Sequence, residues 1–567
     1  MKANGVKQSV ESGQQTASAD DNKPKEKIRV WTQVLACVGA AIGQAAVGAV
    51  SGWSGGSLPS LQDDPDLTPT TAQTAWIVSI MALGAMLGGA MAGRLMDAVG
   101  RRRTLLLAAP VLMAGWALMG LAPNVPTIIV GRFVAGLSTG FILASSQVFT
   151  SESCESRLRG KMSSLPTLFF TSGTLSAYTG GALLSWRYNC IVCAASCIPM
   201  ILILLVVPET PYWLLLKGQR SKSEAALRWL RGGQCELEPV LRTMEDKLDA
   251  VGSKLSMREL WHPRTRTPLL MALFLQAAQQ LCGGTLLFFY TSTVYITMGH
   301  SKSNLAAVYT GIAQLTTSGI SLLLVDRVGR RPLMITSTAI VGTLLIAMGF
   351  YQQSRMMGGA SIDWLPILLV LLTVSGYCLG CRSVPLILSS ELFNTTARST
   401  AQASCTLFNR GLNMAVMQIF PFFLAGAGLS TVFFVHGCIG LLSSLVTFLW
   451  IPETKNKTLE EIQEYFEERA ANKNNNGGSG SGNNNGGSGS GTPFSSSPLG
   501  SFFSKFTLTN TEKNNQKQKQ QQQQQQQQSQ SSQPELPLKT NTNTTSSSHM
   551  YVKEGVANSI VINDDLP

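Results

Sequence analysis

Long apolar runs separated by short polar loops constrain this chain more than any other feature of its sequence. Several runs between residues 30 and 451 reach the roughly 18 to 20 residues that an α-helix needs to cross a hydrocarbon core. Charged residues make up only 13% of the chain, against about 25% in soluble globular proteins. The mean hydropathy is +0.15 despite a long polar tail. The sequence therefore predicts an all-α polytopic membrane protein.

We predict twelve transmembrane helices in two six-helix halves, residues 29–207 and 267–452, joined by cytoplasmic linker helices at 208–266. The predicted spans are residues 30–53, 72–95, 105–121, 127–148, 164–184, 190–207, 269–297, 305–325, 333–351, 364–388, 399–425 and 430–451. We expect a disordered cytoplasmic arm at 1–28, which lacks the apolar segment of a signal peptide. A short cytoplasmic helix is predicted at 453–471, and a disordered low-complexity tail at 472–567.

The distribution of charge predicts the topology. The net charge of +12 is compatible with nucleic-acid binding, but Lys and Arg concentrate in the loops on one side of the predicted spans. This pattern follows the positive-inside rule and places both termini in the cytoplasm. The plasma membrane is the default location, and an intracellular membrane is the alternative. We therefore expect no nucleic-acid partner, and instead a monomer in the lipid bilayer that acts on a small solute.

Two cysteine pairs, Cys190-x-x-Cys193 and Cys378-x-x-Cys381, have the spacing of redox or zinc motifs. Both lie inside predicted spans, where we interpret them as small packing residues. The four histidines are scattered and indicate no metal site. The sequence thus predicts no cofactor and no metal centre.

Three charged motifs occur once in each predicted half, in the same order. They are Asp97 to Arg102 with Asp326 to Arg331, Glu152 to Arg159 with Glu391 to Arg398, and Pro208-Glu209-Thr210 with Pro452-Glu453-Thr454. Such ordered recurrence indicates a duplicated architecture. Two parallel six-helix halves related by an axis along the membrane normal are the plan of the major facilitator superfamily.

We expect the repeated charged residues to form a gate on the cytoplasmic side. Their ion pairs, on adjacent helix ends and in the facing half, would hold that side closed while the site faces outward. One exposed pair contributes about 0–1 kcal/mol, so several are needed. The alternative is that these residues only fix topology. The predicted gating set is Gly93, Asp97, Arg101, Arg102, Glu152, Arg159, Glu209, Asp326, Arg330, Arg331, Glu391, Arg398 and Glu453.

The second copy of the first motif has Leu322 at the position of Gly93. We therefore expect a looser helix approach in the second copy, and a larger gating role for Asp97 and Arg101.

Further motifs resemble the sugar porter family of that superfamily. These are Gln279-Gln280-x-x-Gly283 in the seventh predicted span, Gly131-Arg132-x-x-x-Gly136 in the fourth, and the closing stretch Pro452 to Glu461. The likeness covers about residues 30–470. The stretch from Thr74 to Gly89 resembles the arthropod trehalose facilitators and related hexose facilitators.

The resemblance implies a sugar site. Gln279 and Gln280 would be the main hydroxyl-binding pair, and Phe289 and Tyr290 would form a lid on the extracellular side. Physical reasoning supports part of this expectation. Exposing a side-chain amide to lipid is costly, so at least one of the two glutamines should face the central cavity. The alternative is an amide that bridges two helices. The full predicted substrate-binding set is Gln279, Gln280, Thr285, Phe289, Tyr290, Thr167, Asn409 and Arg382.

The sequence departs from the family pattern at several of these positions. Thr285 stands where the family has Asn, Thr167 where it has Gln, and Asn409-Arg410 where it has Asn-Trp. Arg382 replaces part of a proline-rich motif in the tenth span. An arginine inside a span must face a cavity or a partner. Arg382 and Arg410 could therefore bind an anionic substrate, or they could pair with backbone carbonyls or water at the cytoplasmic mouth.

The predicted function is facilitative transport of a sugar, either a hexose or a disaccharide resembling trehalose, by alternating access. Proton-driven members of the family use a carboxylate in the first span, and residues 30–53 contain no Asp or Glu, so we expect uncoupled transport. The alternatives are a transporter of an organic anion and a non-transporting sensor. An enzyme is not expected, because no nucleophile or metal constellation is found.

Overall fold

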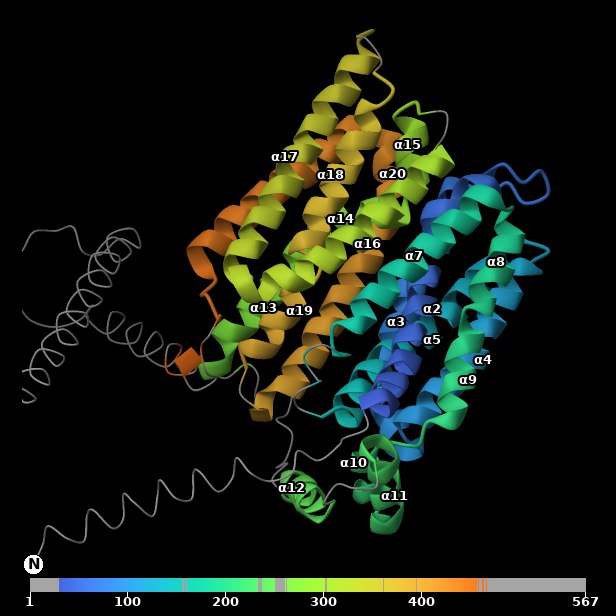
Figure 1. Cartoon of the computed structure of the whole chain (residues 1–567). Coiled ribbons are helices and arrows are strands. Elements are labelled where there is room, and N and C mark those ends of the chain that lie inside the picture. The colour runs from blue at the N-terminus through green and yellow to red at the C-terminus, as the bar shows by residue number, and fades with distance from the viewer. Residues whose placement is uncertain are drawn as a thin grey trace, which may run out of the picture. The chain divides into compact units, whose positions relative to one another are not determined.

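The computed structural model describes residues 30–466, except for 156–157, 159, 161, 233–236, 250–260, 262, 301–302, 360–361, 394, 456, 458–460, 463 and 465. The described part consists of helices joined by short turns (Figure 1). The arm predicted at 1–28 and the tail predicted at 472–567 lie outside it, as does most of the helix predicted at 453–471.

The first half is formed by helices that cover all six of its predicted spans. They are α2 (Val30–Gln62), α3 (Thr71–Val99), α4 (Arg101–Gly120), α5 (Val125–Ser153), α7 (Leu165–Leu183), and the pair α8 (Trp186–Ala195) and α9 (Cys197–Val206). We predicted that the first helix ends at Trp53, but α2 continues to Gln62. Its added turns are buried, and Ser54, Ser57 and Leu58 pack inside the protein, so this segment is not an exposed loop.

Small residues allow the closest helix contact of the first half, between α2 and α7. A Cβ added at Gly48 would lie 1.9 Å from the carbonyl oxygen of Phe170, and one added at Gly173 would lie 1.8 Å from that of Ala45. Either contact is impossible for any other residue without moving a helix. Close backbone approach of this kind holds helices together where lipid removes the hydrophobic driving force.

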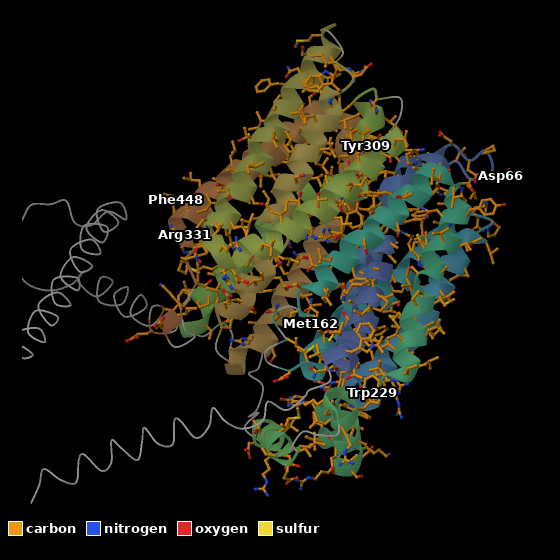
Figure 2. The ribbon with its side chains drawn as sticks, in the orientation of Figure 1. Asp66, Met162, Trp229, Tyr309, Arg331 and Phe448 are labelled. Atoms are coloured by element: carbon orange, nitrogen blue, oxygen red, sulfur yellow. The ribbon has the colours of Figure 1, made fainter. Side chains whose placement is uncertain are left out.

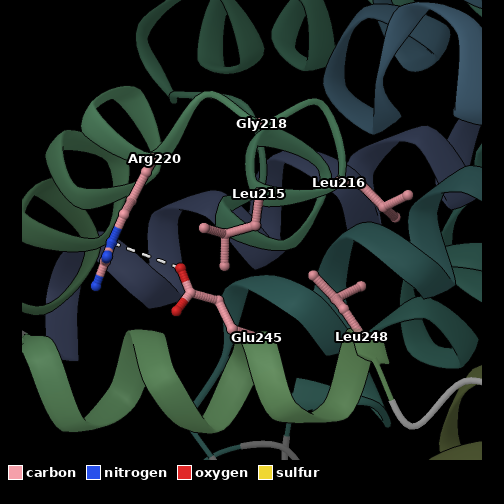
Figure 3. A pocket seen from close by; sticks show the side chains of 6 residues that line it. All are labelled: Leu215, Leu216, Gly218, Arg220, Glu245 and Leu248. Carbon is pink, nitrogen blue, oxygen red and sulfur yellow. Dashed lines mark ion pairs between the residues drawn. The ribbon is translucent and has the colours of Figure 1, made fainter. Parts of the chain in front are cut away.

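The described residues of the linker form three short helices: α10 (Pro211–Leu216), α11 (Arg220–Arg231) and α12 (Glu238–Asp249). Thr32 Oγ1 donates to Leu230 O at 2.8 Å, which joins α11 to the start of α2. A cavity of about 500 Å³ is lined by Leu215, Leu216, Gly218 and Arg220, and by Glu245 and Leu248 of α12. Figure 3 shows the ion pair between Arg220 Nε and Glu245 Oε1, 3.5 Å long, beside this cavity. None of the predicted site residues line it.

The second half repeats the plan with more interruptions. Its helices are α13 (Pro263–Leu281), α14 (Gly284–Phe289), α15 (Thr291–Thr297), α16 (Ser303–Val328), α17 (Arg330–Met356), α18 (Leu365–Leu379), α19 (Val384–Glu391) and α20 (Thr395–Trp450). The last covers the eleventh and twelfth predicted spans, with a non-helical residue at Gly428 between them.

Each of the twelve predicted spans coincides with a helix or with a helix broken in two or three pieces. Nine helical stretches of the described residues are long and apolar enough to cross a membrane, and one of these is the double-length stretch Ala397–Trp450. The breaks in the seventh and tenth spans were not predicted. They lie at Gly283, whose φ is +81°, at Tyr290, and at residues 380–383.

Candidate substrate site and charged end

Five buried amide side chains form one hydrogen-bonded cluster between α13 and α20. Asn409 Nδ2 donates to Gln276 Oε1 at 2.9 Å and to Gln279 Oε1 at 2.8 Å. Gln280 Nε2 donates to Asn409 Oδ1 at 3.1 Å, and Asn413 Nδ2 donates to Gln280 Oε1 at 3.0 Å. The structure thus brings three predicted residues, Gln279, Gln280 and Asn409, into a single network.

The cluster also reaches the broken tenth span. Gln279 Nε2 donates to the carbonyls of Cys381 at 3.2 Å and Arg382 at 2.6 Å, and Gln276 Nε2 donates to that of Pro385 at 3.3 Å. Every one of these contacts bridges two helical elements, which is the alternative that the sequence left open for the glutamine pair. A sugar that used Gln279 would have to replace these protein bonds with its own hydroxyls.

Gln276 and Asn413 were missed in the sequence, although a signal was present. Gln276 precedes Gln279 and Gln280 by three and four residues, and Asn413 follows Asn409 by four. Residues at these spacings share one face of a helix. Two facing stripes of amides inside apolar helices would have indicated the whole cluster.

Arg382 lies against two aromatic rings. Its guanidinium carbon lies 4.6 Å from the ring centroid of Phe170 on α7 and 5.5 Å from that of Phe288 on α14. The atom Nη1 is buried and has no hydrogen-bond partner among the described residues. Arg382 therefore joins the two halves through cation–π contacts, and neither reading of the sequence anticipated this.

Thr285 lies near the same point, where Thr285 Oγ1 and Tyr377 OH are 2.8 Å apart. The ring of Tyr377 packs edge-on against Phe288, with centroids 5.4 Å apart. Thr167 lies in the first turn of α7, one turn before Phe170, and is half-buried. Arg410 follows Asn409 on α20 and is half-buried, and the described residues provide it with no hydrogen bond or ion pair.

Tyr290 and Phe289 lie at the junction of α14 and α15. Tyr290 OH donates to Met417 O at 3.0 Å, and its ring lies 4.5 Å from that of Phe420. Tyr290 also lines a cavity of about 300 Å³, together with residues of the α2–α3 connection and of α20. Phe289 is buried. Tyr290 therefore packs against α20, and Phe289 is buried at the same junction.

We use the term charged end for the end of the bundle that carries the motifs of residues 97–103, 152, 209–210, 326–331, 391 and 453–454. In the first half, Glu209 caps α4. Its Oε1 accepts from the backbone N–H of Arg101 and of Arg102, both at 2.9 Å, and its Oε2 accepts from that of Arg103 at 3.3 Å. A carboxylate at this position satisfies N–H groups that a helix leaves unpaired, and it complements the helix dipole.

Arg101 completes the arrangement in the first half. Its Nε pairs with Glu152 Oε2 at 3.1 Å, and its Nη1 lies 3.5 Å from Asp97 Oδ1. Thr210 Oγ1 donates to Glu152 Oε2 at 2.6 Å. The motifs that recur in sequence therefore meet in space as one network.

The second half repeats this network residue for residue. Glu453 accepts from the backbone N–H groups of Arg330 and Arg331, both at 3.1 Å. Arg330 Nη2 pairs with Glu391 Oε1 and with Asp326 Oδ1, each at 3.3 Å. Arg331 lies beside Phe448, donating to its carbonyl oxygen and facing its ring at 5.6 Å (Figure 2).

One expectation for the gating set, the role of Gly93, needs correction, whereas ion pairs between the halves stay a prediction for the state in which the charged end is closed. No hydrogen bond or ion pair of the described residues joins the halves at the charged end, because each carboxylate is already occupied by donors of its own half. Gly93 is exposed, and a Cβ added there would meet nothing within 4 Å, so it does not permit a closer helix approach. Arg159 lies outside the described residues, and Arg398 Nε is buried with no partner among them.

Hydrogen bonds between the halves lie nearer the opposite end of the bundle. Ser292 Oγ donates to Gly55 O at 2.6 Å, and Tyr178 OH donates to Phe288 O at 2.7 Å. Ser79 Oγ donates to Gln418 Oε1 at 2.5 Å. The bundle is thus closed between its halves at the end away from the charged motifs.

Arg132, a fully buried charged side chain in the core of the first half, is balanced without an acid. Arg132 is fully buried and donates to Ile77 O at 2.9 Å, to Val50 O at 2.8 Å and to Ser54 Oγ. Its guanidinium also faces the ring of Trp53 at 5.3 Å. The sequence from 98 to 151 and from 260 to 325 contains no Asp or Glu that could pair with such a group.

Known proteins resemble this chain in sequence over most of its described length. A family model described as "Sugar (and other) transporter" matches residues 4–466. The facilitated trehalose transporter Tret1 of Drosophila pseudoobscura pseudoobscura is 30% identical over 462 residues, which cover 78% of this chain and 53% of that protein. Tret1 of Anopheles gambiae is 29% identical over 460 residues, which cover 78% and 58%. The chain spans about half the length of these relatives.

Solved structures share the fold. The xylose transporter XylE from E. coli, in an inward-open conformation, superposes with a TM-score of 0.64 at 21% identity, over 76% of this chain and 98% of that one. The proton:xylose symporter XylE bound to 6-bromo-6-deoxy-D-glucose gives a TM-score of 0.60 at 23% identity, over 76% and 99%. The predicted fold of the major facilitator superfamily is confirmed, and the relatives are membrane transporters and not enzymes. The chain is a multi-pass membrane protein and belongs to the sugar transporter family.

Proposed function

We propose that this chain carries a sugar, a hexose or a disaccharide resembling trehalose, across a membrane by facilitated diffusion. The observation that carries the proposal is the amide cluster around Asn409. It provides buried neutral donors and acceptors, which match the hydroxyls of a sugar without a net charge. Broken helices at mid-bundle, such as α13–α14 and α18–α19, are a common way to build such a site.

The cluster has unused hydrogen-bonding capacity. Among the described residues, Gln280 Nε2 donates only to Asn409, and Asn413 Oδ1 accepts no hydrogen bond. A sugar hydroxyl can donate to Asn413 and accept from Gln280 at the same time. The predicted roles of Gln279, Thr285 and Tyr290 belong to the same proposal, because Tyr290 lines the cavity at the closed end of the bundle.

Uptake into liposomes tests this function. The purified chain is reconstituted and supplied with radiolabelled trehalose, glucose or a panel of organic anions. We expect saturable sugar uptake that falls at least about fivefold in Gln280→Ala and Asn413→Ala, because a lost hydrogen bond to a buried amide costs about 1–3 kcal/mol. Thr316→Ala is the matched control, since Thr316 is exposed and bonds only to its own helix. Uptake of an anion and of no sugar would overturn the proposal.

The transport is proposed to be uncoupled from protons. No Asp or Glu is found between residues 30 and 62 or between 98 and 151, and Arg132 is balanced by carbonyls. His436, bonded through Nδ1 to Leu281 O at 2.7 Å, is the histidine that lies inside a predicted span. We expect an imposed proton gradient to leave the initial uptake rate unchanged. A gradient-driven accumulation of sugar that disappears in His436→Gln would contradict uncoupled transport.

A second candidate substrate is an organic anion bound by Arg382. The supporting observation is its buried Nη1, which lacks a partner among the described residues. In that case Arg382→Gln would abolish uptake of the anion, whereas Gln280→Ala would leave it intact. The opposite pattern favours the sugar.

The contacts support a proposal for the transport cycle and the orientation. The halves are bonded near one end and carry no bonds between them at the charged end, so the site is proposed to open toward the charged end in this structure. We place that end and both termini in the cytoplasm, in the plasma membrane, with the chain acting as a monomer. A thiol-reactive probe that cannot cross the membrane should label Asp66→Cys from outside intact cells and Lys217→Cys only after permeabilisation.

A further inference from the structure

The breaks in the seventh and tenth spans face each other, and the side chain of Gln279 connects them. Helix α13 ends at Leu281, and Gly283 follows in the left-handed region. Helix α18 ends at Leu379, and α19 begins at Val384. Gln279, in the last turn of α13, donates to the carbonyls of Cys381 and Arg382 in the second break. The relative position of the two breaks therefore depends on two hydrogen bonds of Gln279 that the substrate is proposed to replace.

Each break also carries one thiol, and the two thiols are in contact. The sulfur atoms of Cys282 and Cys381 lie 3.6 Å apart, and both side chains are fully buried. Their backbones are anchored, since Cys282 N donates to Ala278 O at 3.1 Å and Cys381 N donates to Ser337 Oγ at 2.8 Å. A disulfide bond is about 2.05 Å long, so the sulfurs need to approach by only about 1.5 Å.

We propose that Cys282 and Cys381 are an oxidation site that locks the two broken helices together. The oxidant is a small neutral peroxide such as hydrogen peroxide. One thiol, as its thiolate, attacks a peroxide oxygen and the O–O bond breaks, which gives a sulfenic acid and one water once the proton is returned. The second thiol attacks the sulfenic sulfur, the S–O bond breaks, and a second water leaves. Two electrons pass from the thiols to the peroxide, and one S–S bond forms.

The consequence for transport rests on the proposed sugar function. A covalent bond between the breaks keeps the carbonyls of Cys381 and Arg382 against Gln279, because Cys381 can no longer move away from the end of α13. Gln279 then stays engaged with the protein and is withheld from the substrate. Oxidation is therefore expected to lower uptake, and reduction of the disulfide to restore it.

Other cysteines of the chain supply controls. Cys378 lies one turn before Cys381 and is a free, buried cysteine, so its substitution is a control for the loss of a neighbouring thiol. Cys37 and Cys154 form a second close pair in the first half, with their sulfur atoms 2.9 Å apart. Cys37→Ser removes this second pair, so that any remaining effect of oxidation is attributable to the first.

The experiment uses the full chain in liposomes, treated with hydrogen peroxide and then digested without reduction. We expect a disulfide-linked peptide pair containing Cys282 and Cys381, and at least a fivefold loss of sugar uptake that dithiothreitol reverses. Cys378→Ser and Cys37→Ser should retain this sensitivity, whereas Cys282→Ser, Cys282→Ala and Cys381→Ser should lose it.

Two outcomes would overturn the inference. One is the absence of the linked peptide pair, and the other is its formation with uptake unchanged. The peptide map and a rise in melting temperature on oxidation need no substrate. If untreated chain takes up no sugar, the proposed function fails, while these two readouts still decide whether the thiol pair forms the lock.

Discussion

The ion pair between Arg101 and Glu152 makes a sharp prediction about stability, because its copy in the second half differs in burial. The side chains of Arg101 and Glu152 are 9% and 15% exposed, whereas those of Arg330 and Glu391 are 17% and 28% exposed. Removing one partner of a fully buried pair costs about 3–5 kcal/mol, and an exposed pair contributes about 0–1 kcal/mol. We expect Arg101→Ala to cost about 2–4 kcal/mol and Arg330→Ala about half as much.

The contacts that Glu152 retains after the substitution decide how large this cost is. In Arg101→Ala, Glu152 keeps only the hydroxyl of Thr210 as a donor from the network, at 2.6 Å. Since 1 kcal/mol shifts the melting temperature by about 2–4 °C in domains of 150–250 residues, a cost of about 2–4 kcal/mol gives an expected fall of about 4–16 °C. The same logic gives a smaller fall for Arg330→Ala.

Thermal unfolding of the purified chain in detergent measures both variants beside Arg103→Ala, whose side chain is exposed. The double variant Arg101→Ala, Glu152→Gln should recover part of the loss, because the remaining amide needs no counter-charge. The reasoning is refuted if Arg101→Ala melts no lower than Arg103→Ala, or if Arg330→Ala is the more damaging of the two copies.

Three further predictions concern the chain outside this pair. Gly100→Ala should lower the melting temperature by several degrees, because Gly100 has a φ of +105° and a Cβ would lie 2.4 Å from Glu209 Oε2; Gly93→Ala, on an open helix face, should be neutral or slightly stabilising. The indole N–H of Trp186 lowers the pKa of the Asp64 carboxyl, so this bond stabilises the fold above the ordinary pKa and is lost as the pH falls through the lowered folded value. Asp64→Asn should therefore melt a few degrees lower than the parent at pH 7. At pH values below the folded pKa of Asp64, the two proteins should have the same melting temperature, and a difference that persists in acid would contradict this. Replacing Phe170 with Leu should weaken the cation–π contact of Arg382 and change substrate affinity by less than about tenfold, measured as KM in the uptake assay; a complete loss of transport would mean a different role for Phe170.

The fold was predictable because its signals are long and repeated. Twelve apolar runs and three duplicated motifs identified the architecture without any knowledge of contacts. The breaks at Tyr290 and at residues 380–383 were not predicted, although Arg382 and Ser383 interrupt the apolar sequence at the second break. They depend on tertiary packing, as in the bond from Tyr290 OH to Met417 O.

The candidate site was predicted in part. Gln279, Gln280 and Asn409 were named from the resemblance, and the structure places them together. What could not be foreseen is the partner of each amide, since Gln279 bonds to backbone carbonyls that no side-chain pattern reveals. The aromatic contacts of Arg382 were not predicted for a similar reason. Phe170 belongs to the other half, and nothing in the sequence around Phe170 marks it as a partner for an arginine.

The capping of α4 by Glu209 also bears on the order in which the chain can assemble. The carboxylate lies 108 residues beyond the N–H group of Arg101 that it binds, and Glu453 lies 123 residues beyond that of Arg330. At about 5–20 residues per second, a ribosome needs roughly 5 to 20 s to supply the first cap after its helix has been made. Until then the helix start at the membrane surface must be satisfied by water or lipid headgroups. Each half is therefore completed by its own last residues, and the first can mature before the second has been synthesised.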